Sequence, residues 1–388
     1  MTKRVALIVA AALLIGGLFS QFGPGPDILA PALDAQRRVP RRADEPPLTV
    51  EQYTPRSTLV VDEHPVPRAK FPVVDIHSHH WQLSASQWST TISEMDELNL
   101  QVLVNLIGGS GSRLRSFIAT VRESPNPDRM VFFANLDFDR GVYPGFGQRA
   151  ADQLENDVQA GAVGLKFFKN FGIDVTDQEG GRVPVDDPEL DPVFRKCAEL
   201  GIPVLIHVGE PSEFYQPVDE HNERWLELTL RPGRRMPPSR YPTFEEMMAE
   251  RDRLFEKHPD TNFIAAHMGW HANDLGRLGD MLDRLPNVYP ETAAILYELG
   301  RQPRAAREFF IEYQDRVIFG KDTYRASEFP YFWRTFETAD EYFDYYRRYH
   351  AFWKLYGMDL PDDVLKKLYY GNALKVVPGI PRDQFPAL

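Results

Sequence analysis

Eight short apolar runs recur along the sequence after residue 70, and this recurrence restricts the fold more than any other feature. Polar loops and amphipathic stretches with helical spacing separate the runs. Apolar strands that alternate with helices are typical of a parallel sheet whose strands are buried on both faces. Eight units over about 250 residues predict an α/β fold of the (β/α)8 TIM barrel class, with a doubly wound open sheet as the alternative. The runs are Phe71–His77, Leu100–Ile107, Met130–Leu136, Ala162–Phe168, Ile202–His207, Asn262–His267, Asn287–Thr292 and Arg316–Asp322.

The stretches between the runs predict an outer layer of helices. After the last run, Glu328–Tyr356 is dense in Phe, Trp and Tyr, and we expect extra C-terminal helices there that pack on the barrel. The longest connection, residues 208–243, is a candidate substrate loop, because long loops in compact domains tend to be functional. The expected helices are Thr91–Asn99, Ser110–Glu123, Gly147–Ala160, Asp187–Leu200, Phe244–His258, Ala272–Leu285 and Pro303–Asp315.

The N-terminus has the pattern of a targeting segment. Lys3 and Arg4 precede an apolar run of 15 residues, Val5–Phe19, which has the length of a signal-peptide core and is short for a membrane-spanning helix. We expect residues 1–36 to direct export, to the periplasm or out of the cell. The alternative is an uncleaved anchor that tethers the chain to the membrane through residues 5–19. Residues 37–70 are rich in Pro and Arg and predict a linker, which leaves 71–380 as the barrel domain.

Charge and cysteine content exclude several classes of protein. The net charge of −12 argues against a nucleic-acid partner, because phosphate binding needs a basic surface. The single cysteine, Cys197, excludes an intrachain disulfide framework and a cysteine-based zinc site. A small-molecule partner is compatible with this composition, and the oligomeric state stays open.

The end of the first run carries three histidines within four residues, in the sequence FPVVDIHSHH. Side chains two apart in a strand share a face, so Asp75, His77 and His79 point the same way. Adjacent neutral imidazoles on a rigid strand suit a divalent metal ion. Taken alone, the pair is equally compatible with a polar strand end whose histidines are solvated.

Other runs also end in polar side chains, and in a TIM barrel these ends meet at one face. His207 ends the fifth run and His267 ends the sixth. Asp322 ends the eighth, where a buried carboxylate needs a partner. Three histidines with one carboxylate make a Zn²⁺ site that leaves a coordination position for water. Lys166, in the fourth run, is either a bridging metal ligand or substrate contact, or the partner of a carboxylate.

Five motifs, in order, make the chain similar to the amidohydrolase superfamily, and in detail to its amidohydrolase-related (type 2) branch. They are DIHSHH, GLKFF, LIHVGEP, AAHMGW and FGKD, and the similarity spans roughly Phe71 to Pro378. The resemblance implies a metal held by His77, His79, His207 and Asp322. It places His267 beside the metal, as a ligand of a second ion or as a group that polarises the substrate and transfers protons. Lys321 departs from the branch, which usually has a small residue before the aspartate.

The expected chemistry is hydrolysis of an amide, lactone or ester of a small molecule by a metal-activated water, with Asp322 transferring the proton. One Zn²⁺ ion or two would serve. The same branch contains metal-dependent decarboxylases and hydratases, which are the alternative, and a non-catalytic exported metal- or ligand-binding barrel is the alternative of a different class. Further candidates for contact with the substrate or with the ligands are Glu210, His271 and Arg325.

Overall fold

The computed structural model describes residues 48–49 and 52–388, so the predicted signal or anchor segment at residues 1–36 lies outside the described residues. The chain divides into two units between Thr58 and Leu59. The described residues of the first unit, 48–49 and 52–58, contain no helix or strand. Throughout the described part of the chain, no helix combines the length and the apolar character needed to cross a membrane. The second unit, residues 59–388, contains the predicted barrel.

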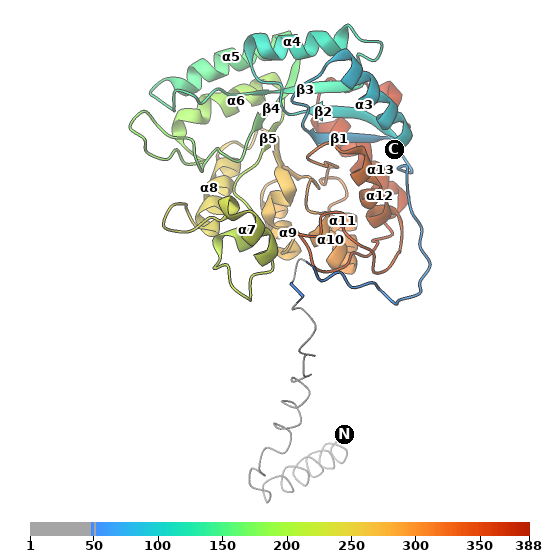
Figure 1. Cartoon of the computed structure of the whole chain (residues 1–388). Helices are drawn as coiled ribbons and strands as arrows, with labels where there is room; N and C mark the ends of the chain where they lie inside the picture. Colours follow the sequence, from blue (N-terminus) through green and yellow to red (C-terminus); the bar gives the residue numbers. More distant parts are fainter. Residues whose placement is uncertain (1–47, 50–51) are drawn as a thin grey trace, which may run out of the picture. The chain divides into compact units, whose positions relative to one another are not determined.

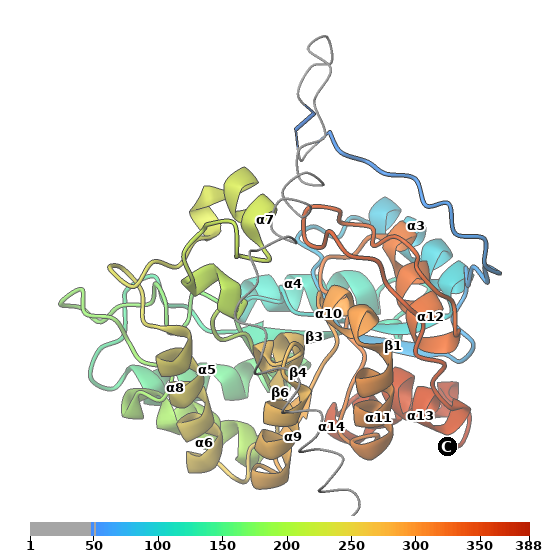
Figure 2. The same ribbon diagram turned by 90° about the horizontal axis from the view of Figure 1, so that it is seen from below.

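Seven parallel strands of the second unit form one sheet, and their order in the sheet follows their order in the chain. The helices lie outside the curved sheet (Figures 1 and 2), so each strand is followed by an outer crossover. The predicted TIM-barrel fold is confirmed. The strands are β1 (Val73–Ser78), β2 (Leu100–Asn105), β3 (Met130–Asn135), β4 (Ala162–Phe167), β5 (Val204–Ile206), β6 (Phe263–Ala265) and β7 (Val288–Pro290).

The eighth predicted run closes the barrel without forming a regular strand. It bridges to the end of β1 through Ser78 and Asp322, and to the residue after β7 through Glu291 and Ile318. The backbone N–H of Asp322 donates to the carbonyl of His77 at 2.7 Å. Extended pairing stops there because Asp322 has a φ of 87°, in the left-handed region. The seam of the barrel is therefore held by single bridges, and it lies beside the first histidine motif.

The outer helices fall where the amphipathic stretches predict them. Ser84 and Thr243 each form a capping box at the start of their helices, which pairs backbone donors that have no partner within the helix. Gly161 and Gly201 end their helices in the left-handed conformation that glycine adopts readily. These helices are α3 (Ala85–Leu98), α4 (Gly111–Arg122), α5 (Phe146–Ala160), α6 (Asp191–Leu200), α8 (Phe244–Lys257), α9 (Leu275–Arg284) and α11 (Pro303–Glu312).

The long connection after β5 contains three short helices separated by turns and irregular segments. They are η2 (Ser212–Tyr215), α7 (Trp225–Leu230) and η3 (Pro232–Arg234). A further helix, α10 (Leu296–Arg301), follows β7. The chain ends with α13 (Asp362–Lys366), the π-helix η6 (Lys367–Gly371), α14 (Asn372–Val376) and the short η7 (Arg382–Gln384).

The expectation of helices throughout Glu328–Tyr356 is wrong for most of that segment. Only η5 (Ala326–Glu328) and α12 (Phe329–Glu337) are helical. The side chain of Thr338 donates to the carbonyl of Arg334 and accepts the N–H of Asp340, which competes with a continued helix. The following chain instead pairs with itself, because Phe343 and Leu355 form an antiparallel bridge. Phe343 and Tyr345 still pack inward, whereas Tyr342 and Phe352 are exposed.

Candidate metal centre

The two histidines of the first motif lie at the end of β1 and face a common point. The Nε2 atom of His79 is 3.2 Å from Oδ1 of Asp322, and the Nε2 atom of His77 is 3.8 Å from the same oxygen. Below them, Oδ1 of the fully buried Asp75 accepts the N–H groups of His77 and Lys321, each at 3.0 Å, and so ties β1 to the eighth run. Burial raises the pKa of Asp75 to about 8.

Asp322 reaches this point because its backbone turns at the closing seam of the barrel. Burial by itself would raise its pKa, but the hydrogen bond with His79 and the nearby His77 and His267 hold the pKa well below its usual value. The carboxylate therefore stays ionised at neutral pH. Lys321, which precedes it, turns away and donates to Glu328 and to the carbonyl of Thr323.

His207 and His267 follow β5 and β6 and lie against each other, with ring centroids 4.4 Å apart. The Nδ1 atom of His267 is 2.7 Å from the carbonyl of Ala293, so this nitrogen carries the proton and Nε2 accepts. That Nε2 atom is 3.2 Å from Nδ1 of His207. His207 thus donates from Nδ1, and its Nε2 atom is buried and has no hydrogen-bond partner among the described residues. The chain of hydrogen bonds leaves His207 with one lone pair turned into the site.

His267 lies on an unusual backbone. His267, Met268, Gly269 and Trp270 all have φ between 51° and 60°, in the left-handed region. Non-glycine residues visit this region at a cost of roughly 1–3 kcal/mol each unless the surroundings hold them. The Trp270 ring stacks on His267 with centroids 4.5 Å apart. Tertiary contacts rather than local preference therefore place this histidine.

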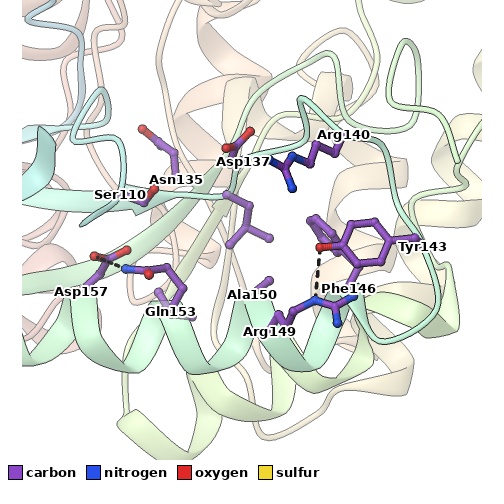
Figure 3. A pocket seen from close by; sticks show the side chains of 12 residues that line it. Ser110, Asn135, Asp137, Arg140, Tyr143, Phe146, Arg149, Ala150, Gln153 and Asp157 are labelled. Atoms are coloured by element: carbon purple, nitrogen blue, oxygen red, sulfur yellow. Dashed lines mark hydrogen bonds between the residues drawn. The ribbon is translucent and has the colours of Figure 1, made fainter. Parts of the chain in front are cut away.

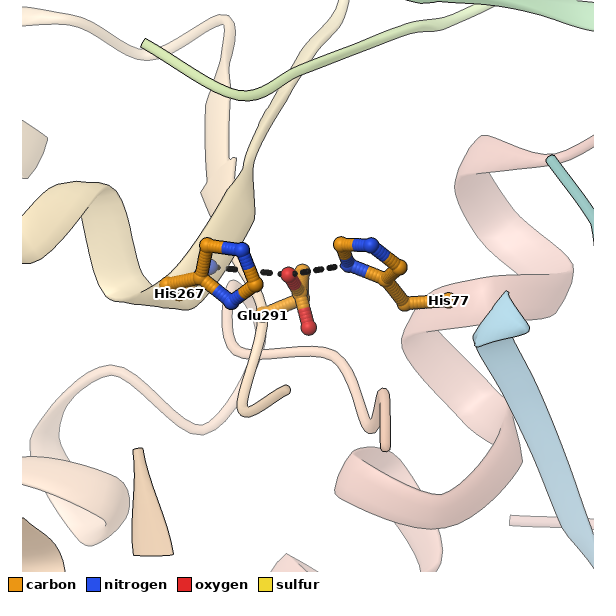
Figure 4. A group of neighbouring side chains, drawn as sticks. All are labelled: His77, His267 and Glu291. Atoms are coloured by element: carbon orange, nitrogen blue, oxygen red, sulfur yellow. Dashed lines mark hydrogen bonds and ion pairs between the residues drawn. The ribbon is translucent and has the colours of Figure 1, made fainter. Parts of the chain in front are cut away.

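Glu291 is a site residue that the sequence analysis missed. It directly follows β7 and lies between His77 and His267 (Figure 4). Its Oε1 atom accepts the ring N–H of His77 and the backbone N–H of His267, both at 2.8 Å. Burial raises the pKa of Glu291. A carboxylate directly after an apolar run was the signal used for Asp322, and the same rule applied to Asn287–Thr292 would have found Glu291.

Lys166 lies inside the barrel on β4 and is 2% exposed. Its Nζ atom has no hydrogen-bond partner among the described residues and lies 5.5 Å from the centre of the Phe168 ring. Burial lowers the pKa of Lys166 to about 7, against the opposing effect of Glu291 and Asp322. Of the readings left open for Lys166, the one in which it forms an ion pair with a carboxylate has no support in the described contacts.

A cavity of about 340 Å³ opens above these groups. Its walls include His77, His79, His207, His267 and Asp322, together with Lys166 and Glu210. The structure does not bring the other two candidates into it. His271 is buried behind it, where Nη2 of Arg251 donates to its Nε2 atom at 3.2 Å. The side chain of Arg325 is 68% exposed and does not line the cavity.

Three cations, Lys169, Arg224 and Arg234, form one linked wall of this cavity, called here the cationic wall. Lys169 donates to Glu210 at 2.7 Å, and Arg234 lies 3.6 Å from the same carboxylate. Arg234 and the buried Arg224 share Glu227. Arg224 also donates to the hydroxyl of Tyr297 at 2.6 Å. Three cations held by two carboxylates leave this wall positively charged, in a protein whose net charge is −12.

A second cavity of about 300 Å³ lies over the ends of β2 and β3 and along α5 (Figure 3). Polar and apolar side chains line it, and Nε of Arg149 donates to the hydroxyl of Tyr143 at 3.2 Å. Gln153 donates to Asp157 at 3.0 Å. Among the described residues it shares no lining side chain with the histidine cavity. A third cavity of about 310 Å³ lies between them, because its lining includes Trp81 and Phe168 of the histidine cavity and Asn135 and Asp137 of this one.

The donor set fits a divalent ion. His77, His79 and Asp322 place one ligand atom each within 4.8 Å of one another. His77 donates from Nδ1 to Glu291, which leaves its Nε2 lone pair toward Asp322. The unpartnered, buried Nε2 of His207 is a further nitrogen without a protein partner. Imidazole nitrogens with one carboxylate oxygen are the ligands of open zinc sites.

The fold and this group of side chains together define a TIM-barrel protein with a candidate metal centre. The Amidohydrolase family model matches residues 59–379, and the chain belongs to this family. Comparison with curated proteins gives no match. The family explains the resemblance carried by the five motifs.

Solved structures share the fold at low sequence identity. An uncharacterised TIM-barrel protein from Bordetella bronchiseptica is 15% identical with a TM-score of 0.50, over 79% of this chain and 98% of that one. A protein from Staphylococcus aureus described as a putative amidohydrolase is 16% identical with a TM-score of 0.51, over 79% of this chain and 99% of that one. A 2,6-dihydroxybenzoate decarboxylase from Rhizobium is 16% identical with a TM-score of 0.48, over 79% and 98%.

Burial of His267 predicts a pH-dependent contribution to stability. Burial, aided by the neighbouring His77, lowers the pKa of His267 to about 4, whereas the pKa of a histidine in an unfolded chain is about 6.5. At a pH between these two pKa values, the histidine is protonated in the unfolded chain and neutral in the folded chain. The contribution of His267 to the unfolding free energy therefore falls by about 3 kcal/mol as the pH drops from 6.5 to 4. We expect the difference in unfolding free energy between the metal-free wild type and His267→Asn to shrink by this amount. Urea titrations of both proteins at pH 7, 5.5 and 4 measure it, and a difference that stays constant contradicts the prediction.

Proposed function

We propose that the protein is a metal-dependent hydrolase in which an activated water attacks the amide, lactone or ester carbonyl of a small anionic molecule. The observation that supports this most is the convergence of His77, His79, His207 and Asp322 on one cavity. In this arrangement the histidine hydrogen bonds leave lone pairs turned inward. A cavity of about 340 Å³ has room for a substrate above these groups.

The four residues would hold one Zn²⁺ ion. Their three imidazole nitrogens and one carboxylate oxygen are ligands that zinc prefers. When bound, the ion lowers the pKa of a coordinated water towards neutrality and supplies the nucleophile. We favour a single ion because both ring nitrogens of His267 have protein partners, Ala293 and His207. His267 then acts by holding His207 in the tautomer that presents Nε2 to the ion.

In this proposal Asp322 transfers the proton from the attacking water to the leaving group. Its pKa lies well below the usual value, so it is ionised when the substrate arrives and accepts a proton from the attacking water. It then returns the proton to the leaving group. We assign Lys166, whose Nζ atom is unpartnered among the described residues, to contact with the substrate oxygen on which negative charge develops, because it lines the cavity.

The cationic wall indicates the charge of the substrate. A carboxylate on the substrate could bind N–H groups of Lys169, Arg224 and Arg234, which line the same cavity as the histidines. Such groups favour a small molecule with one anionic end and one hydrolysable end. This also fits the proposal that the partner is a metabolite and not a nucleic acid.

Arg234→Gln should therefore raise KM for a carboxylated substrate about 10-fold with little change in kcat, because one charge-assisted hydrogen bond is lost. The KM for an uncharged analogue of the same substrate should change by less than about 2-fold. Arg235→Gln is the matched control, because Arg235 donates to the carbonyl of Leu228 at 3.1 Å and does not line the cavity. Equal loss with charged and uncharged substrates would contradict the assignment.

Decarboxylation of a carboxylated substrate is the second candidate. The buried, unpartnered Lys166 favours it, because an ammonium next to the ligand group can hold a carboxylate that is lost in the reaction. Hydrolysis and decarboxylation have different products. Assays of zinc-loaded protein on lactones, amides and carboxylated aromatics, with CO₂ release measured beside hydrolysis, separate them. Loss of both bound zinc and turnover in His77→Ala supports the site, and a His77→Ala protein with full zinc and full turnover refutes it.

We also propose that the chain is exported, from the signal-like pattern of residues 1–36. Fractionation of cells that produce the full chain, with N-terminal sequencing of the product, tests this. A protein found in the cytoplasm with its first residues intact would refute export.

A further inference from the structure

Glu291 has two connections to the candidate site, and each involves a different histidine. The residue is 0% exposed and directly follows β7. Its Oε1 atom accepts Nδ1–H of His77 at 2.8 Å and the backbone N–H of His267 at 2.8 Å. Its Oε2 atom accepts the backbone N–H of Ala293 at 2.6 Å. Both carboxylate oxygens are thus occupied by N–H donors, and Figure 4 shows the side chain between the two rings.

The bond to His77 determines the tautomer of that ring. An imidazole that donates from Nδ1 keeps its lone pair on Nε2. Nε2 is the atom that faces Oδ1 of Asp322, at 3.8 Å. If His77 carried its proton on Nε2 instead, a hydrogen would point at the position where the ligand atoms converge.

The bond to His267 acts on the backbone. His267 begins the left-handed stretch that runs to Trp270. The side chain of Glu291 binds the N–H of His267, and its main-chain carbonyl binds the N–H of Met268 at 2.8 Å. Two consecutive N–H groups of the turn are therefore held by one residue. His267 in turn accepts the proton of His207, so the tautomer of a second proposed ligand depends on this contact.

Glu291 is not placed to bind the same ion as His77 Nε2. It contacts the Nδ1 edge of the His77 ring, whereas the carboxylate of Asp322 faces the Nε2 edge. The grouping of His77, His267 and Glu291 is close enough to suggest a second ion. However, the Glu291 oxygens already accept three N–H groups, which is the pattern of a carboxylate that orients histidines.

We propose that Glu291 is the positioning residue of this site: it fixes the Nδ1–H tautomer of His77 and holds the backbone turn that carries His267. The meaning of this role for catalysis rests on the proposed metal-dependent function, but the role itself concerns hydrogen bonds of the metal-free protein. A carboxylate is required because both of its oxygens accept. A glutamine in its place offers one accepting oxygen and one donating amide, so it opposes an N–H group whichever way the amide turns.

The test uses the full chain with ¹⁵N-labelled histidine, metal-free at pH 7. The ring nitrogen shifts of His77, assigned by their loss in His77→Gln, report which nitrogen carries the proton. We expect Nδ1–H in the wild type and a changed proton position in Glu291→Gln, with zinc affinity in the variant weaker by 10–100-fold. Glu250→Gln is the control for loss of a buried carboxylate, because Glu250 binds Arg182 and the N–H of Val185 instead of the histidines. This control should keep the His77 signal and the zinc affinity of the wild type.

An Nε2–H tautomer of His77 in the wild type overturns the proposal, even if Glu291→Gln does not fold. So does a folded Glu291→Gln with unchanged His77 shifts and unchanged zinc affinity. A wild type that has the Nδ1–H tautomer, which Glu291→Gln changes, but binds no zinc supports the positioning role and refutes the proposed function. The two failures are therefore distinguishable.

Discussion

Asp322→Asn is expected to lower kcat by about 10³-fold, because the amide cannot accept a proton from the attacking water. The carboxylate oxygen lies 3.2 Å from His79 and its pKa is held well below the usual value, so the wild-type group is ionised at neutral pH. The amide is also a weaker metal ligand than the carboxylate, so we expect reduced zinc content at limiting zinc. Steady-state kinetics at saturating zinc, beside metal analysis by mass spectrometry, separate the two losses.

The fold should survive this substitution, because the backbone bond from Asp322 to the carbonyl of His77 does not involve the side chain. Asp315→Asn is the matched control. Asp315 pairs with Lys367 at 2.8 Å on the surface, and its side chain is 67% exposed. We expect wild-type turnover and zinc content for this control. If Asp322→Asn keeps more than about a tenth of wild-type kcat at saturating zinc, proton transfer by Asp322 is ruled out.

Gly320→Ala is expected to damage both stability and metal binding. A methyl group at this position would lie 2.3 Å from Oε2 of Glu291 and 3.0 Å from Cβ of His77. Neither neighbour can yield easily, because Glu291 is fixed by three N–H groups and His77 lies in a fully buried strand. We expect a loss of about 3 kcal/mol of unfolding free energy, typical of overpacking, and much weaker zinc binding. Urea unfolding and competition with a chelator measure the two effects.

Gly276→Ala provides the comparison. Gly276 lies in the first turn of α9, and the nearest atom to an added methyl there is Oδ1 of Asp274 at 3.7 Å. Alanine is the better helix former, so this variant should be neutral or more stable by up to about 1 kcal/mol. A Gly320→Ala protein as stable as Gly276→Ala, with wild-type zinc affinity, would show that the seam tolerates the methyl group.

The sequence predicts the barrel well because its main signal is local. Apolar runs bounded by capping residues mark strands and helices without knowledge of distant contacts, and the boundaries of α5 and β4 differ from the predicted ones by one residue at most. The prediction for the segment after Glu337 fails for the opposite reason. Its aromatic content predicts burial, but its path depends on Thr338 and on pairing between Phe343 and Leu355.

The residues of the candidate site also fall into those that the sequence predicts and those that depend on distant contacts. His77, His79, His207 and Asp322 stand at the ends of apolar runs, so barrel geometry alone predicts that they meet. His271 also follows a run closely, but the left-handed turn at residues 267–270 carries it behind the wall to Arg251. Four successive positive φ angles are held by contacts with β7, and nothing in the local sequence beyond Gly269 signals them. Tertiary hydrogen bonds of this kind, including those of Glu291, are what a single sequence does not reveal.

The seam between β1 and the eighth run has a consequence for how the protein matures. The bond between Asp75 and the N–H of Lys321 joins positions 246 residues apart. Contacts between residues so far apart in the sequence form late in folding, because closing a long loop costs conformational entropy. A ribosome-bound chain that lacks its last quarter therefore has His77 and His79 but not Asp322. The complete set of proposed ligands exists only after synthesis has passed Asp322, so tight metal binding would indicate that the eighth run has joined the barrel.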